Sequence, residues 1–135
     1  MLKFWYESEK DMNGLYVFIG GGLGALTRYM LTCIMPKNCY LPYCTLLANF
    51  FGCFIATVIF VYLVMKSDIN SAYKSFFIVG FCGGLSTLSS LSLEVLNYLH
   101  GGEYLKTFLY IFVSILTCII AVIFGIFLVK KTLCS

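Results

Sequence analysis

The sequence predicts an all-α membrane protein of four transmembrane helices. Of its 135 residues, 61% are hydrophobic and only 11% are charged, and the mean hydropathy is +0.94. A soluble domain carries about 25% charged residues because water must wet its surface. The apolar residues also gather in four stretches, each reaching the ~20 residues that cross a ~30 Å hydrocarbon core. Lipid must therefore cover much of this chain.

The four stretches are expected to form helices within one domain over residues 1–135. Backbone groups in lipid must be hydrogen-bonded inside their own segment, which favours helices. A transmembrane barrel would need strands of about ten alternating residues, and nothing here alternates in that way. The predicted spans are residues 14–35, 43–65, 75–99 and 107–129. Because so small a bundle can hardly enclose a pore alone, we expect an oligomer.

The lysines predict how the helices are oriented in the membrane. With four spans, both termini and the second loop share one side. That side holds Lys3, Lys10, Lys66, Lys74, Lys130 and Lys131, and the other side holds Lys37 and Lys106. Cytoplasmic loops carry the excess of positive residues, so both termini are expected in the cytoplasm, at the plasma (inner) membrane. The net charge is +3, but the basic residues form no stripe along the sequence. The charge therefore does not indicate a nucleic-acid partner.

The first span combines a close-packing face with a buried cation. Gly20 and Gly24 form a G-x-x-x-G face that lets another helix approach closely. Arg28 lies about two-thirds of the way along the span, where an arginine costs roughly 2.5 kcal/mol or more unless it reaches water. It either snorkels to the nearer interface or faces a polar vestibule.

The second span has a small, partly polar face. Thr45, Asn49, Gly52 and Ala56 recur at helical spacing. In mid-membrane the amide of Asn49 needs partners. It either bonds to another helix or lines an ion path.

The third span is expected to be a broken helix. The adjacent glycines Gly83 and Gly84 each destabilise a helix by about 1 kcal/mol relative to alanine, and a run of hydroxyl residues follows them. Hydroxyl groups can bond to a freed backbone, and broken helices expose carbonyl and amide groups to ions. Beyond the break, Thr87, Ser90 and Glu94 should share one face. A packing helix with a simple kink is the alternative.

The fourth span places polar residues at helical spacing on one face. Tyr110, Ser114 and Cys118 follow one another at intervals of four residues. They either line a polar track beside a pore or, in the case of serine, bond to the carbonyl one turn earlier. The seven cysteines have no metal-ligand spacing, so we interpret them as small packing residues.

Three motifs in three spans, taken together, resemble the CrcB/Fluc fluoride channel family. They are Gly-Gly-x-x-Gly-Ala-x-x-Arg-Tyr, ending at Tyr29; Thr-Leu-x-x-Asn-x-x-Gly, from Thr45; and Gly-Phe-Cys-Gly-Gly-x-Ser-Thr, from Gly80. They occur in order, and the resemblance covers nearly the whole chain.

The resemblance implies an antiparallel dimer with two fluoride pores and a central sodium ion between the broken third helices. The main-chain carbonyls of Gly83 and Ser86 match the sodium ligands. Asn49 matches the pore asparagine, Tyr110 and Ser114 match a polar track, and Arg28 matches a common arginine. The expected fluoride path comprises Thr45, Asn49, Leu88, Ser89, Ser90, Leu91, Tyr110 and Ser114, with Arg28 at its vestibule.

One departure concerns two positions that hold phenylalanine in the resembled family. Here they hold Leu88 and Leu91. An aromatic ring edge carries partial positive charge that can face an anion, and leucine has none.

The leading hypothesis is therefore passive fluoride efflux without covalent chemistry, so the protein is not expected to be an enzyme. A pore-completing subunit that pairs with a paralogue is the alternative, favoured by the two leucines and the uneven lysine count; a homodimer remains the first expectation. A small proton-coupled multidrug exporter is less favoured, because the first two spans contain no Asp or Glu.

Overall fold

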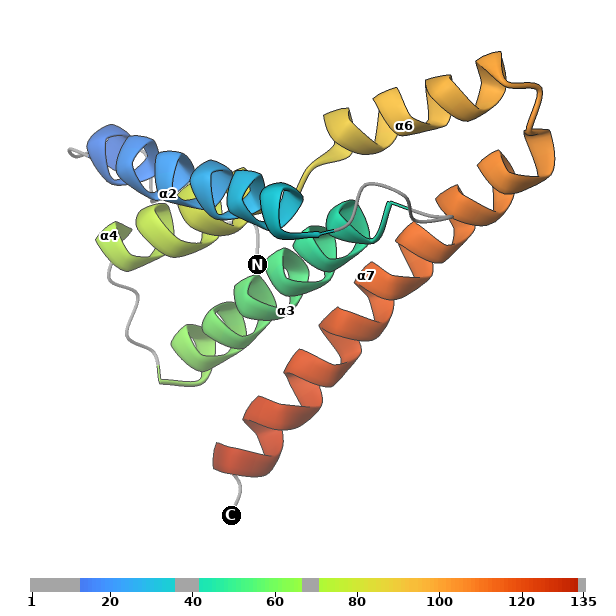
Figure 1. The fold of residues 1–135 in the computed structure, drawn as a ribbon. Coiled ribbons are helices and arrows are strands. Elements are labelled where there is room, and N and C mark those ends of the chain that lie inside the picture. Colours follow the sequence, from blue (N-terminus) through green and yellow to red (C-terminus); the bar gives the residue numbers. More distant parts are fainter. Residues whose placement is uncertain (1–12, 36–41, 67–70, 134–135) are drawn as a thin grey trace.

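The computed structural model describes residues 13–35, 42–66 and 71–133. The helices in order are α2 (Asn13–Ile34), α3 (Tyr43–Lys66), α4 (Ser71–Tyr73), the π-helix η2 (Lys74–Cys82), α5 (Gly83–Leu85), α6 (Leu88–His100) and α7 (Tyr104–Leu133). Figure 1 shows their arrangement. Within these ranges there is no strand.

The all-α fold with four membrane-spanning helices is confirmed. Four helical stretches are long and apolar enough to cross a membrane: Gly14–Ile34, Tyr43–Met65, Lys74–His100 and Tyr104–Thr132. The last begins before the predicted residue 107 because Thr107 N–H already donates to the Glu103 carbonyl at 3.0 Å. The chain is thus a multi-pass membrane protein. Lys3, Lys10 and Lys37 of the orientation argument lie outside the described residues, as do Cys39 and Cys134.

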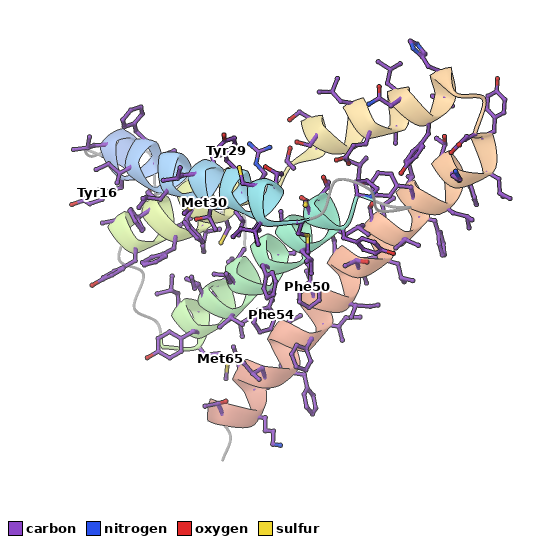
Figure 2. All side chains as sticks on the ribbon, viewed as in Figure 1. Tyr16, Tyr29, Met30, Phe50, Phe54 and Met65 are labelled. Carbon is purple, nitrogen blue, oxygen red and sulfur yellow. The ribbon has the colours of Figure 1, made fainter. Side chains whose placement is uncertain are left out.

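The helices pack in two pairs. α2 packs mainly against η2 and α5, and α3 packs mainly against α7. In Figure 2, Phe50 and Phe54 lie on the side of α3 that faces α7. The ring of Phe54 stacks on Phe124 of α7 with 5.6 Å between ring centroids. Apolar packing between these two helices therefore fixes the polar residues that both carry.

Glycines bring α2 and the third span into backbone contact. A Cβ atom added to Gly24 would collide with the Phe81 carbonyl oxygen, and one added to Gly84 would collide with the Gly21 carbonyl oxygen. The prediction that Gly20 and Gly24 form a close-approach face is confirmed, since a Cβ on Gly20 would likewise meet the Phe76 carbonyl.

The third span is broken, but the predicted position of the break was wrong. Gly83 is helical (φ −64°, ψ −36°), and α5 continues to Leu85. The extended residues are Ser86 (φ −71°, ψ 150°) and Thr87 (φ −149°, ψ 118°). Gly84 remains helical and lets the third span pack closely against α2. The interruption comes two residues later, where side chains capture the backbone.

Beyond the break, α6 and α7 form a helical hairpin that extends away from α2 (Figure 1). α6 buries none of its residues. At the hairpin turn, Gly102 adopts the left-handed region with φ 72°, which glycine allows without a Cβ penalty. The start of α6 therefore remains close to the break, while its far end contacts α7.

Candidate functional site

Besides Lys74, Ser75 and Thr107, which lie at the starts of their spans, five polar residues are buried in the described membrane-spanning segments. They come from α3, the break and α7, and each exposes 8% or less of its surface: Thr45, Asn49, Thr87, Tyr110 and Ser114. Buried polar groups require hydrogen-bond partners. Their bonds show what the site is built to hold.

Asn49 bonds to the backbone of Thr87 on both sides of its amide. Its Oδ1 accepts from Thr87 N–H at 2.6 Å, and its Nδ2 donates to the Thr87 carbonyl at 3.3 Å. The helix-to-helix bond, one of the two readings of Asn49, is therefore observed. A role in the anion path remains a prediction for the second N–H of the same amide.

Thr87 caps the helix that follows the break. Its hydroxyl accepts from Ser90 N–H at 3.1 Å, which is the bond of an N-cap residue. The same oxygen lies 3.1 Å from the hydroxyl oxygens of both Ser89 and Ser90. Thr87 thus begins α6 as its N-cap, and the hydroxyl groups of Thr87, Ser89 and Ser90 lie close together at the break.

Glu94 is the functional candidate that the expected fluoride path left out. Its Oε1 accepts from the Thr45 hydroxyl at 2.7 Å, and its Oε2 accepts from the Tyr110 hydroxyl. Because a carboxylate inside a membrane span is costly, its position within the third span was the available signal. The structure connects this acid to two predicted pore residues.

A cavity of about 240 Å³ lies beside these groups. Its lining residues are Ala25, Arg28, Tyr29, Thr32, Cys44, Thr45, Thr87, Ser90 and Glu94. The predicted common face of Thr87, Ser90 and Glu94 is confirmed, since all three line it. Tyr29 of α2, labelled in Figure 2, is one of these lining residues.

Arg28 faces the cavity and does not snorkel. Its Nη1 donates to the Ser90 hydroxyl at 3.1 Å, and its buried Nε has no hydrogen-bond partner in the described structure. An always-charged guanidinium with an unused donor favours anions in a low-dielectric space. The cavity thus has a cation at one wall and a carboxylate, held by two hydroxyls, at another.

Other predicted path residues lie outside this cavity. Leu88 is 76% exposed, Ser89 is exposed and Leu91 is half-buried, and none of them lines the cavity. Ser114 on α7 donates to the Tyr110 carbonyl at 2.7 Å, as serine bonding one turn back does. Within one chain, α7 therefore contributes Tyr110 to the network through its hydroxyl.

Two main-chain carbonyls at the break fit the expected sodium site. In a continuous helix, the Gly83 carbonyl would accept from Thr87 N–H, which instead donates to Asn49. The Ser86 carbonyl would accept from Ser90 N–H, which instead donates to the Thr87 hydroxyl. Hard cations prefer oxygen ligands. For both Gly83 and Ser86, the N–H that would bond to the carbonyl in a continuous helix thus donates to a side chain.

Comparison with known proteins adds independent support. Residues 15–126 match the family described as CrcB-like protein, Camphor Resistance (CrcB). A relative from Pyrococcus abyssi, named fluoride-specific ion channel FluC, is 38% identical over 117 residues, covering 87% of this chain and 95% of its own. Two further relatives have the same name. The one from Francisella philomiragia is 38% identical over 120 residues, covering 85% of this chain and 92% of its own, and the one from Nitratiruptor is 37% identical over 125 residues, covering 89% and 96%. The chain belongs to the CrcB family, and the resemblance seen in its motifs is confirmed.

Proposed function

We propose that this protein is a fluoride channel that lets fluoride leave the cytoplasm passively. One observation carries the proposal. In a chain 38% identical to a protein named fluoride-specific ion channel, the intramembrane cavity is lined by the Arg28 guanidinium and by the hydroxyls of Thr87 and Ser90. Relatives of this name are channels, so no catalytic residue is assigned, as expected of a protein that is not an enzyme.

The site can receive a small, strongly hydrated anion by substituting its water. Arg28 supplies a positive charge. The hydroxyl groups of Thr45, Thr87 and Ser90, on short side chains, supply hydrogen-bond donors. Selectivity then rests on pore width and donor placement. An anion that moves past Glu94 must compete with this carboxylate for the hydroxyls of Thr45 and Tyr110, because both already donate to it. The cost of that competition favours an anion that accepts hydrogen bonds as strongly as fluoride does.

The active unit in this proposal is an antiparallel dimer in the inner membrane. α6 buries no residue within one chain, and Leu88 at its start is exposed, which supports a second copy completing the path near Leu88, Ser89 and Leu91. A sodium ion between the two breaks, held by the Gly83 and Ser86 carbonyls, would neutralise their partial negative charges. Six lysines against two favour cytoplasmic termini. In Figure 1 the C-terminal ends of α3 and α7, which carry three of the six, lie on the same side.

A second candidate is a pore-completing subunit in a heterodimer. Leu88 and Leu91 favour it because they lack the positive ring edge, and the lysine bias opposes insertion of one sequence in both orientations. Co-expression with a paralogue of opposite bias would then be required for flux.

The test is fluoride efflux from proteoliposomes that contain the purified protein alone, followed with a fluoride electrode. We expect efflux well above that of protein-free vesicles, and no matching efflux of chloride. Efflux only after a paralogue is added would favour the partner subunit, and equal fluoride and chloride rates would exclude a selective fluoride channel.

A further inference from the structure

We propose that Asn49 is a positioning residue that keeps the third span broken, by replacing the helical hydrogen bond of Thr87 with bonds to its own side chain. The inference goes beyond the proposed channel activity, because it concerns how α3 imposes a backbone conformation on another span. It rests on the proposed function only where it predicts effects on sodium and on fluoride flux.

The geometry favours side-chain capture as the cause of the break. An amide N–H left unpaired within a membrane is costly, so Thr87 N–H must donate either to Gly83 or to another acceptor. Asn49 Oδ1 takes it at 2.6 Å, and Asn49 Nδ2 also reaches the Thr87 carbonyl at 3.3 Å. Both groups of one amide therefore bind one extended residue, as a neighbouring strand would.

Neither glycine before the break explains it. Gly83 and Gly84 both lie within helical segments, and the chain leaves the helix only at Ser86. The helix also makes its last regular bond there, from Ser86 N–H to the Cys82 carbonyl at 2.9 Å. The first backbone N–H without its helical partner is the one that Asn49 holds.

Gly52 lets α3 approach closely enough for this contact. It lies three residues after Asn49, on the same face. A Cβ atom added there would be 3.0 Å from the Ser86 Cβ and 3.3 Å from the Cys82 carbonyl oxygen. Asn49 thus binds the extended segment, and Gly52 leaves room for it on the same face of α3. Because Thr87 N–H then donates to Asn49, the Gly83 carbonyl loses its helical donor.

The test compares Asn49→Leu and Asn49→Asp with Thr45→Val in the full-length protein in detergent. Thr45 lies one turn earlier on α3, but its hydroxyl donates to Glu94 and not to the third-span backbone, so it is the matched control. The readout is the backbone carbon chemical shifts of Ser86 and Thr87, which report whether each residue is extended or helical. This measurement requires neither fluoride nor sodium.

We expect extended shifts in the wild type, in Thr45→Val and in Asn49→Asp, which keeps an acceptor for Thr87 N–H. In Asn49→Leu the shifts should move toward helical values. The difference in thermal stability between sodium and a bulky organic cation should disappear in Asn49→Leu and in no other variant. Fluoride flux should fall to background in Asn49→Asp, because a second negative charge faces the anion.

Extended shifts that persist in Asn49→Leu would overturn the proposal. If that variant does not fold, a Thr87 amide that exchanges in the wild type without protection, while the Ser86 amide is protected, would do the same. Absence of fluoride flux in the wild type, with the shifts as expected, would reject the channel and leave the role of Asn49 intact.

Discussion

The Tyr110 hydroxyl of α7 donates a hydrogen bond to the Glu94 carboxylate of α6. Tyr110 is fully buried, and the second oxygen of Glu94 is held by Thr45 of α3. One intramembrane acid therefore links three helices next to the cavity that carries Arg28. Removing the Thr45 or the Tyr110 hydroxyl, which both donate to Glu94, should therefore change how readily an anion passes along the path.

Tyr110→Phe should lower fluoride flux strongly, because it removes a donor while keeping the ring. A hydrogen bond to a charged group is worth about 1.5–3 kcal/mol, which corresponds to a roughly ten- to hundredfold lower rate. Ser114→Ala is the control on the same helix face, since the Ser114 hydroxyl bonds to its own helix. Its flux should stay within about twofold of the wild type. Equal losses in both variants would contradict the network reading.

Leu88→Phe combined with Leu91→Phe should raise fluoride flux. The rings would offer positive edges to the anion, and Leu88 is exposed enough to be replaced by a larger side chain. We expect the wild type to conduct more slowly than relatives with both phenylalanines, as measured by efflux from proteoliposomes at matched protein density. A wild-type rate equal to theirs, unchanged by the double substitution, would make the ring edge irrelevant here.

Sodium should stabilise the purified protein, and Ser86→Ala should preserve that effect. The expected ligands are main-chain carbonyls, so the Ser86 hydroxyl is dispensable. The measurement is thermal unfolding in sodium and in a bulky organic cation of equal ionic strength. Identical unfolding temperatures for the wild type in both salts would exclude a structural sodium ion. A loss of the difference in Ser86→Ala alone would shift the site to the side chain.

Gly84→Ala should destabilise the protein, whereas Gly83→Ala should not. A Cβ on Gly84 would collide with the Gly21 carbonyl, but a Cβ on Gly83 meets only the Ile78 carbonyl oxygen at 3.9 Å. Overpacking typically costs 1–3 kcal/mol, whereas alanine in a helix gains up to about 1 kcal/mol over glycine. The two variants differ by one position, so thermal unfolding of the pair isolates the contact with α2. Similar unfolding temperatures for both would show that the helices can separate without cost.

The sequence by itself determined the class of the protein and its spans. Too few charges and four long apolar stretches leave no water-exposed surface for a soluble fold, and lipid then requires helices. It also determined which spans hold polar groups, because Thr45 and Asn49 in one apolar stretch, and Tyr110 and Ser114 in another, are each spaced four residues apart. The close-approach role of Gly20 and Gly24 followed from the same periodicity.

Only the tertiary structure decided where the third span breaks and what Glu94 contacts. Glycine propensity favoured Gly83 and Gly84, but propensity is a weak local term of about 1 kcal/mol per residue. An unpaired amide in lipid costs several kcal/mol, so the side chain that can pair it sets the position. Asn49 is that side chain, 38 residues away in the sequence, and it reaches Thr87 because α3 and the third span pack together. The bonds from Thr45 and Tyr110 to Glu94 depend in the same way on helices meeting in space, which no spacing within one helix contains.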